Sequence, residues 1–291
     1  MFDHILFPTD GSEGASIAFE HVLDIADEHD ARVHILNVAD TTRDSVVRIQ
    51  RDVVDVLADE GERVVESAAD RARDRGVATV TAVLQGEPYR TIVEYAADRD
   101  IDVVVMPTHG RSGLERLLLG STTERVVRRS TVPVLTINPS DESAITYPYR
   151  NVLVATDGSD CANHALKTGI EVASATDAAL HLLTVVLVGS LGFDVRSTVQ
   201  MDTLEEHAND VLDEATARAA RAGIEPTDTR IEFAASESQA IRTDIETHDV
   251  DLVVVGTHGR TGFDRYLLGS VTEQLIRTAD VPVLTVRGPP S

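Results

Sequence analysis

The sequence predicts a chain built from two copies of one α/β domain, each a parallel sheet covered by helices on both faces. Three observations lead to this fold class. A set of sequence blocks occurs twice in the same order, short apolar runs alternate with longer amphipathic stretches, and several apolar runs contain no polar residue. Strands that are apolar throughout are typical of parallel sheets buried on both faces.

The repeat is the first of these observations. The two halves share five blocks, offset by 147 residues at first and by 149 later. A period of this length indicates the duplication of a whole domain and not a short solenoid unit. The paired blocks are HILFPTDGS and NVLVATDGS (4–12, 151–159), HILNV and HLLTV (34–38, 181–185), DVVVMPTHG and DLVVVGTHG (102–110, 251–259), LGSTTE and LGSVTE (119–124, 268–273), and VPVLTI and VPVLTV (132–137, 281–286).

The alternation of apolar and amphipathic segments predicts the elements of the first copy. The run Val103-Val104-Val105 is a continuous apolar strand of the kind that a doubly covered sheet needs. Alternating strands and helices with right-handed crossovers favour a doubly wound, Rossmann-like topology. The expected strands lie near 3–8, 32–38, 78–84, 102–107 and 132–137, and the expected helices near 13–30, 45–75, 88–99 and 121–130.

The domain boundaries follow from the same comparison of the two halves. After Ile137 the sequence NPSDESAITYPY is polar and contains two prolines, a composition typical of a linker. We therefore expect a first domain over 1–139, a linker over 140–149 and a second domain over 150–288.

Acidic residues greatly outnumber basic residues in this sequence. Asp and Glu total 49 against 26 Lys and Arg, a formal net charge of −23, and Lys167 is the single lysine. Such a surface repels nucleic acid, so no nucleic-acid partner is expected. An acid excess with almost no lysine resembles haloarchaeal proteins, in which salt screens the self-repulsion. An ordinary acidic soluble protein is the alternative.

The sequence shows no recognisable membrane or export signal. No run of about 18 apolar residues predicts a membrane span, and the start MFDHILFPTDG has neither the basic region nor the long apolar stretch of a signal peptide. Cys161 is the only cysteine, so no internal disulfide can form. We expect a cytoplasmic protein without a membrane partner.

The closing strand of each copy contains a proline, Pro133 or Pro282. Proline cannot donate to a strand ladder, so it points to an edge strand. An exposed edge of sequence VLTI invites pairing with another strand. We expect the two domains to pair through their fifth strands as an intramolecular pseudo-dimer, with a homodimer as a further option. An edge protected by proline alone is the alternative.

The segment after the fourth strand of the second copy carries the motif Gly256-x2-Gly259-x9-Gly269-Ser270. Its first glycine ends a buried strand, and Ser270-Val-Thr-Glu273 marks the start of a helix by a capping-box pattern. Ligands of open α/β sheets bind at the carboxyl ends of strands, and helix N-termini offer N–H groups and positive potential to phosphate. The segment has the parts of a phosphate cradle, although serines that only cap helices and glycines that only form turns would give the same pattern.

The blocks PTDGS, GTHGR, LGS-x-TE and VPVLTV together resemble the universal stress protein family, over nearly the whole chain and in both copies. The spacing Gly-x2-Gly-x9-Gly-Ser/Thr is that of the family's ATP-binding branch. The resemblance implies adenine nucleotide alpha hydrolase-like domains, each with five strands in the order 3-2-1-4-5, and dimerisation through strand five. It also implies ATP, ADP or AMP bound at the ends of strands one and four, with Mg²⁺ as a candidate partner of the phosphates.

The resemblance also implies which residues contact the nucleotide: strand ends one and two hold adenine, the first loop glycines lie against ribose and phosphate, and the helix start binds the phosphates. In the second copy these residues are Ala155, Thr156, Asp157, Val185, Gly256, His258, Gly259, Arg260, Gly269, Ser270 and Val271. In the first copy they are Pro8, Thr9, Asp10, Val38, Pro107, His109, Gly110, Arg111, Gly120, Ser121 and Thr122. No catalytic residue and no metal ligand is expected among them.

The first copy departs from the motif at one position, where Pro107 replaces the first glycine. Proline has no N–H and a φ fixed near about −65°. If the nucleotide needs that N–H, or a φ that only glycine adopts, the first site is weaker; if the position only needs a bend, the first site is intact. Asp10 and Val38 match the adenine positions, so we expect two unequal sites, the second the stronger.

Several of these residues have an alternative role. Arg111 and Arg260 either contact phosphate or the other domain, or are solvated loop residues. The loop histidines are expected to position the backbone or face ribose instead of binding metal, because no second ligand stands at a suitable spacing. Asp10 and Asp157 are expected to form Asx-turns at the strand ends as well as to contact adenine.

Three functions remain open at this point. The first is a regulatory or stress-response module that binds adenine nucleotide without fast chemistry. The second is a slow ATP hydrolase, although the sequence lacks the GxxxxGK[ST] motif and the SGGxDS loop that related ATP pyrophosphatases show. The third is a scaffold with vestigial loops, which Pro107 favours for the first copy.

Overall fold

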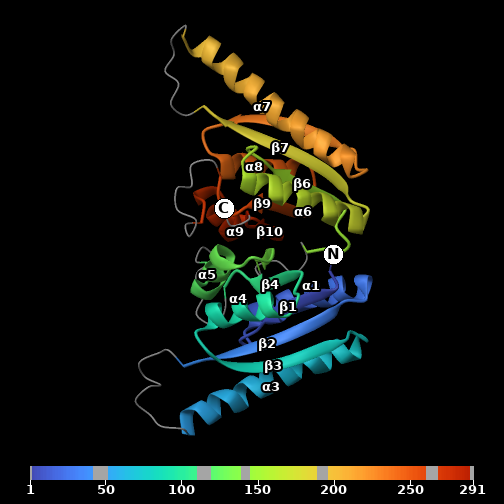
Figure 1. The fold of residues 1–291 in the computed structure, drawn as a ribbon, viewed down its shortest axis with the longest axis vertical. Helices are drawn as coiled ribbons and strands as arrows, with labels where there is room; N and C mark the ends of the chain where they lie inside the picture. Colours follow the sequence, from blue (N-terminus) through green and yellow to red (C-terminus); the bar gives the residue numbers. More distant parts are fainter. Residues whose placement is uncertain are drawn as a thin grey trace. The chain divides into compact units, whose positions relative to one another are not determined.

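The chain divides into two compact units, each carrying one copy of the sequence repeat (Figure 1). The first unit comprises Met1–Pro148 with Ile276–Asp280, and the second comprises Tyr149–Leu275 with Val281–Ser291. The computed structural model describes residues 2–41, 52–109, 119–138, 145–188, 196–259 and 268–288.

The sheet of the first unit has the strand order β3-β2-β1-β4-β5, and its neighbouring strands are parallel. This is the order that the resemblance to the universal stress protein family implies. Its strands are β1 (His4–Pro8), β2 (Arg32–Asp40), β3 (Thr79–Gly86), β4 (Val103–Pro107) and β5 (Val134–Ile137). Its helices are α1 (Glu13–His29), α3 (Asp52–Asp74), α4 (Pro88–Asp98) and α5 (Ser121–Arg129). The start of the helix predicted over 45–75 lies outside the described residues.

The second unit repeats this topology in the order β8-β7-β6-β9-β10, again with parallel neighbours. Its strands are β6 (Asn151–Ala155), β7 (Ala179–Leu187), β8 (Asp228–Ala234), β9 (Leu252–Gly256) and β10 (Val283–Val286). Its helices are α6 (Asp160–Thr176), α7 (Arg196–Arg221), α8 (Glu237–Thr247) and α9 (Ser270–Thr278). The two halves therefore build one fold twice, as the repeat predicts.

Helices cover the sheet of the first unit in two layers. Arg71 of α3 donates hydrogen bonds to the Oγ and the carbonyl oxygen of Ser16 in α1, at 2.8 and 3.2 Å, and α4 packs against α5. Right-handed crossovers place the first pair of helices on one face of the sheet and the second pair on the other. The predicted doubly wound α/β fold is confirmed.

The central strands are buried along their length, as their apolar runs predict. Ile5 and Leu6 of β1 and the three valines at 103–105 of β4 have no exposed surface. The outer strand β3 lacks such a run, and its residues are half-buried or exposed. The core of the unit therefore lies around β1 and β4, the two strands whose carboxyl ends border the candidate site.

The sequence predicts that Pro133 and Pro282 lie within the closing strands. The structure differs, because each proline lies one residue before its strand. β5 and β10 begin directly after Pro133 and Pro282. The carbonyl oxygens of these prolines accept from the N–H groups of Val104 and Val253, at 3.0 and 3.1 Å. Proline thus supplies an acceptor at a position where its missing N–H costs no ladder bond.

A histidine of α1 is buried against the segment that follows β5 in the first unit. His21 is 3% exposed, and its ring meets that of Tyr147 edge-on, with the centroids 5.8 Å apart. The Tyr147 hydroxyl is also hydrogen-bonded to Nε2 of His29. Burial lowers the pKa of His21 from 6.5 to about 4, because a charged imidazole loses its hydration there.

We predict that the first unit loses stability on mild acidification through His21. Its folded pKa is depressed, so its contribution is complete above about pH 6.5 and is lost as the pH falls toward 4. The loss between pH 7 and pH 5 amounts to about 2 kcal/mol. His21→Thr installs the residue found at position 168 of the second copy. In this variant the loss of unfolding free energy between pH 7 and pH 5 should be smaller by that amount. His164→Gln, at an exposed site of α6, serves as the control, and an unchanged acid response in His21→Thr would contradict the assignment.

Candidate functional site

The turn after the first strand of each unit is held by its own side chains. Asp10 Oδ1 accepts from the N–H of Ser12 at 3.0 Å, and Thr9 Oγ1 accepts from the N–H of Gly11 at 3.2 Å. Gly11 has φ of 75°, a left-handed conformation that glycine adopts without strain. The predicted Asx-turn at Asp10 is therefore confirmed.

The second unit builds the same turn with the same geometry. Asp157 Oδ1 accepts from the N–H of Ser159 at 3.0 Å, and Thr156 Oγ1 accepts from the N–H of Gly158 at 3.2 Å. Gly158 also has φ of 75°. Each aspartate thus uses one carboxylate oxygen to fix the turn at the carboxyl end of the central strand.

Two hydrogen bonds in each unit join the end of the fourth strand to the helix that follows the loop. In the second unit Gly269 N–H donates to the carbonyl oxygen of Thr257 at 2.8 Å, and Thr272 Oγ1 donates to that of Gly256 at 2.7 Å. In the first unit the equivalent distances are 2.7 and 3.0 Å, from Gly120 to Thr108 and from Thr123 to Pro107. We call this pair of contacts the loop clamp.

The last loop glycine is required by the closeness of the clamp. A Cβ atom at Gly269 would lie 3.3 Å from the carbonyl oxygen of Thr257 and 3.4 Å from Cα of His258. At Gly120 the corresponding contact with the Thr108 carbonyl oxygen would be 3.2 Å. Backbone atoms cannot give way as a flexible side chain can, so these glycines permit a close approach.

The serine after this glycine is not a helix cap, and the capping-box interpretation is wrong. Gly120 is the N-cap of α5, with no side-chain cap hydrogen bond, and Ser121 is the first helical residue. In α9 Ser270 is likewise the first helical residue, and the Gly269 carbonyl oxygen accepts from the N–H of Glu273. A cap side chain therefore does not take up the N–H groups of the first turn of α5.

The loop histidines act on their own strand ends. Thr108 Oγ1 and His109 Nδ1 are 3.1 Å apart, and so are Thr257 Oγ1 and His258 Nδ1. Each loop histidine therefore contacts the side chain of the threonine that directly precedes it. Among the described residues no group of three or more His, Cys, Asp or Glu is arranged to hold a metal ion.

The structure brings the first and fourth strand ends together in the second unit. A Cβ atom at Gly259 would lie 2.8 Å from Oδ2 of Asp157, so the second loop glycine and the turn aspartate are in contact. Val185 is half-buried near the end of β7, as Val38 is near the end of β2. Of the remaining expected residues, Pro8, Thr9, Ala155 and Thr156 lie at the ends of β1 and β6, and Thr122 and Val271 are second in α5 and α9. Gly110, Arg111 and Arg260 lie outside the described residues.

Sequence reasoning missed a side chain that ties the second strand to the first. Asn37 Nδ2 donates to the carbonyl oxygen of Thr9 at 2.8 Å, and Thr184 Oγ1 donates to that of Thr156 at 3.0 Å. These residues occupy the same place in the blocks HILNV and HLLTV. A polar donor at one position of an otherwise apolar strand was the signal that pointed to them.

A second missed residue belongs to the second unit alone. Glu237 begins α8, where the first unit has Pro88 at the start of α4. Burial, and then the negative charge of Asp157, raise the pKa of Glu237. Glu237 is therefore close enough to Asp157 for the two carboxyl groups of the second unit to influence each other.

Comparison with known proteins places these features in a family. The sequence model of the universal stress protein family matches residues 1–138 and 148–287. The chain belongs to the universal stress protein family. A universal stress protein of Methanocaldococcus jannaschii is 35% identical over 140 residues, which cover 47% of this chain and 82% of that one. One of Mycobacterium tuberculosis is 29% identical over 235 residues, 79% of this chain and 77% of its own.

Solved structures support the fold of the whole chain. The crystal structure of a universal stress protein from Archaeoglobus fulgidus aligns with a TM-score of 0.76 at 24% identity, covering 99% of this chain and 100% of that one. At that identity the likeness concerns the fold. Among the described helices of this universal stress protein, none combines the length and apolar character that crossing a bilayer requires.

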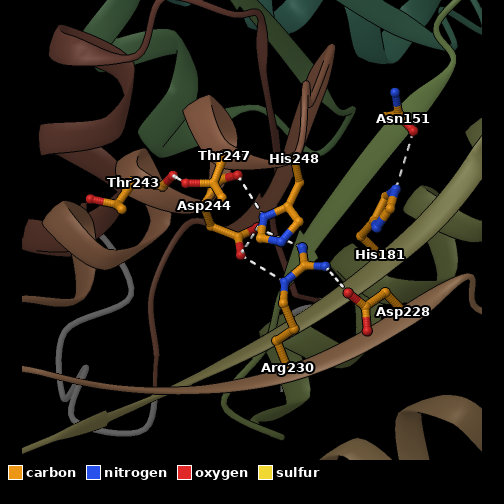
Figure 2. Close-up of polar contacts among 8 residues, drawn as sticks. All are labelled: Asn151, His181, Asp228, Arg230, Thr243, Asp244, Thr247 and His248. Atoms are coloured by element: carbon orange, nitrogen blue, oxygen red, sulfur yellow. Dashed lines mark hydrogen bonds and ion pairs between the residues drawn. The ribbon is translucent and has the colours of Figure 1, made fainter.

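The second unit also contains a charged cluster at the amino ends of its strands, whereas the candidate site lies at their carboxyl ends (Figure 2). The guanidinium of Arg230 donates two hydrogen bonds to the carboxylate of Asp244, both at 2.7 Å, and a third to Asp228. His248 Nδ1 lies 3.2 Å from Oδ1 of the same Asp244 carboxylate. The Asp244 side chain is 2% exposed and that of Arg230 12%, so the central pair is buried.

The first unit fills the same place without an ion pair. Ala82 and Tyr95 stand at the positions of Arg230 and Asp244, and the Tyr95 hydroxyl is 3.1 Å from Nδ1 of His34. In the second unit burial, and then the charge of Arg230, lower the pKa of the equivalent His181. Because ligands of open α/β sheets bind at the carboxyl ends of strands, this cluster at the amino ends is a structural element.

We predict that Arg230→Ala destabilises the second unit by about 3 kcal/mol, because the carboxylate of Asp244 stays buried without its partner. The double variant Arg230→Ala/Asp244→Tyr installs the arrangement of the first unit and should recover most of that loss. Chemical denaturation followed by circular dichroism measures both. Arg218→Ala, at an exposed pair with Glu214, is the control and should leave the unfolding midpoint unchanged. A double variant as unstable as Arg230→Ala would contradict this account.

Proposed function

We propose that this universal stress protein binds adenine nucleotide, ATP or its products ADP and AMP, at the carboxyl ends of the strands in each unit. The observation that carries the proposal is the loop clamp. It fixes the first turn of α9 beside the end of β9, and the contact of Gly259 with Asp157 joins both to the turn after β6. A ligand there meets a helix N-terminus and a turn carboxylate at once.

The phosphate end of the proposed site is the start of α9 or α5. N–H groups at a helix start carry partial positive charge and bind phosphate. In a chain with a net charge of −23, a polyanion needs such a local source of positive potential. Mg²⁺, when bound, would neutralise the phosphates and be held by their oxygens and water, since hard cations take oxygen ligands. The side chain that would help to hold the ion is the hydroxyl of the serine at the first helical position, Ser270 in α9 or Ser121 in α5.

The adenine end of the proposed site lies between the first and second strand ends. Asp157 keeps one oxygen in its Asx-turn and turns the other toward Gly259. Thr184 fixes the backbone at Thr156, and Val185 follows with a half-buried side chain. An apolar wall with a carboxylate acceptor suits a flat base with an amino group.

The two proposed sites are unequal. The N–H of Val253 in β9 donates to the carbonyl oxygen of Pro282, just before β10, and the N–H of Thr257, just after β9, donates to that of Val286 in β10. Successive residues of a parallel strand address opposite neighbours, so the N–H of Gly256 is directed toward β6 and the candidate site. Pro107 has no N–H to offer at this point. We therefore propose tighter nucleotide binding in the second unit than in the first.

The role that follows is regulatory, in a stress response, with nucleotide occupancy setting the state of the protein. The acid excess of the sequence supports a further proposal, namely a salt-rich cytoplasm as the working environment. We also retain the proposal that the fifth strands of the two units pair within the chain. It is supported by the place of β5 and β10 at one end of each unit's own strand order, each preceded by a proline.

Calorimetric titration with ATP in molar KCl tests nucleotide binding. We expect at least one site per chain, and Gly269→Val should weaken the tighter site roughly tenfold or more by forcing a side chain into the clamp. Gly120→Val is the matched control and should affect only the weaker site. No heat and no thermal shift in the unaltered protein would leave the scaffold alternative, and several turnovers of ADP release per minute would favour the hydrolase.

Light scattering after gel filtration tests intramolecular pairing. Between about 0.1 M and 1 M KCl the Debye length falls from about 10 to 3 Å, which removes most repulsion between acidic chains. Pairing within the chain leaves no free fifth strand, so a monomeric mass is expected throughout. A dimer that appears as salt rises, and that Leu284→Arg dissociates, would contradict intramolecular pairing and favour a homodimer.

A further inference from the structure

Gly256, the first glycine of the loop motif in the second unit, lies too close to the start of α6 to carry a side chain. A Cβ atom at Gly256 would lie 2.9 Å from Sγ of Cys161, and 3.2 and 3.3 Å from backbone atoms of Cys161 and Ala162. Gly256 does not have a positive φ, so its backbone conformation is open to other residues. Lack of space, and not conformation, therefore excludes a side chain at this position.

Cys161 is buried, and a hydrogen bond holds its thiol. It is 3% exposed, and its Sγ donates to the carbonyl oxygen of Val286 at 3.3 Å. The chain after β10 also approaches it closely, since a Cβ atom at Gly288 would lie 3.4 Å from the Cα of Cys161. The second residue of α6 thus packs into a gap formed by the ends of β9 and β10.

The first unit carries the opposite combination of residues. Gly14 is the second residue of α1, where the second unit has Cys161, and Pro107 ends β4, where the second unit has Gly256. A bulky residue on the helix faces a glycine on the strand in one unit, and a glycine on the helix accompanies a bulky residue on the strand in the other. In a densely packed interior such paired changes preserve the filled volume.

We infer that Cys161 and Gly14 determine which residue each unit accepts at the head of its phosphate loop, and thereby which site offers a backbone N–H to the nucleotide. Cys161 keeps glycine at 256, whose N–H is directed toward β6. Gly14 admits proline at 107, which has none. Cys161 is a positioning residue: it acts on the ligand through Gly256. The effect on the ligand rests on the nucleotide-binding function proposed above, whereas the steric exchange does not depend on it.

A double-mutant cycle in the full chain tests the exchange. Gly256→Pro should lower the unfolding midpoint of the second unit by roughly 5 °C or more, because the ring is forced against Cys161. Adding Cys161→Gly, which reproduces the first unit, should restore at least half of that loss. Gly256→Ala and Gly256→Ala/Cys161→Gly form a milder cycle in case Gly256→Pro does not fold. A cycle in which the two changes are additive would overturn the inference.

The matched control is made in the first unit. Gly14→Cys should destabilise that unit beside Pro107, and Gly14→Cys/Pro107→Gly should recover it as the transplanted arrangement of the second unit. Titration with ATP then reads the consequence for binding. The affinity of the second site in Cys161→Gly/Gly256→Pro should fall to that of the unaltered first site, whereas Gly14→Cys/Pro107→Gly should strengthen the first site.

The two levels of the proposal fail separately. If the unaltered protein takes up no ATP, the nucleotide function fails while the unfolding cycle still decides the steric exchange. If ATP binds but the cycle is additive, the exchange fails and the nucleotide function stands. Binding by Cys161→Gly/Gly256→Pro at the original affinity would overturn the claim that the exchange sets the strength of the site.

Discussion

The hydrogen bond from the last loop glycine to the residue after the fourth strand is the contact on which the candidate site depends. In both units it joins a strand end to a helix start, and a threonine of the first helical turn adds a second bond to the preceding residue. These two hydrogen bonds thereby fix the two ends of the loop relative to each other. A helix N-terminus is then held at the carboxyl edge of the sheet, where open α/β folds bind ligands.

The same scaffold is filled differently in the two units. At the amino ends of the strands Arg230 and Asp244 replace Ala82 and Tyr95, and at the carboxyl ends Cys161 and Gly256 replace Gly14 and Pro107. Each change involves two residues that are in contact in the second unit. Dense packing explains this pattern, because a single change of volume or charge in the interior leaves either a clash or an unpaired group. Duplication has therefore preserved backbone geometry and allowed the sites to diverge.

Much of the fold could be predicted from the sequence because it depends on local pattern. The repeat gave the two units, and continuous apolar runs such as Val103–Val105 gave the buried central strands. Local pattern misled at the helix start, where Ser270-Val-Thr-Glu273 fits a capping box but the cap is taken by the glycine that closes the clamp. Local pattern also misled at Pro133. It was expected within the closing strand, but it lies just before that strand and its carbonyl oxygen accepts a ladder hydrogen bond there.

The parts of the site that could not be predicted depend on tertiary contacts. Asn37 and Thr184 perform one task with different side chains, so the repeat alone does not mark them. Gly256 looks like a residue chosen for a ligand or a turn, and only the contact with Cys161 reveals a packing requirement. That contact joins residues far apart in the chain, and no periodicity or motif signals it.

The central claim is that the two units are adenine-nucleotide sites of unequal strength. Mass spectrometry of small molecules released from protein purified without added ligand tests it most directly. The account predicts an adenine nucleotide, retained mainly by the second unit and therefore lost from a chain carrying Gly269→Val while Gly120→Val keeps it. Release of no nucleotide from protein that also fails to take up added ATP, or release of a ligand that is not an adenine nucleotide, would contradict it.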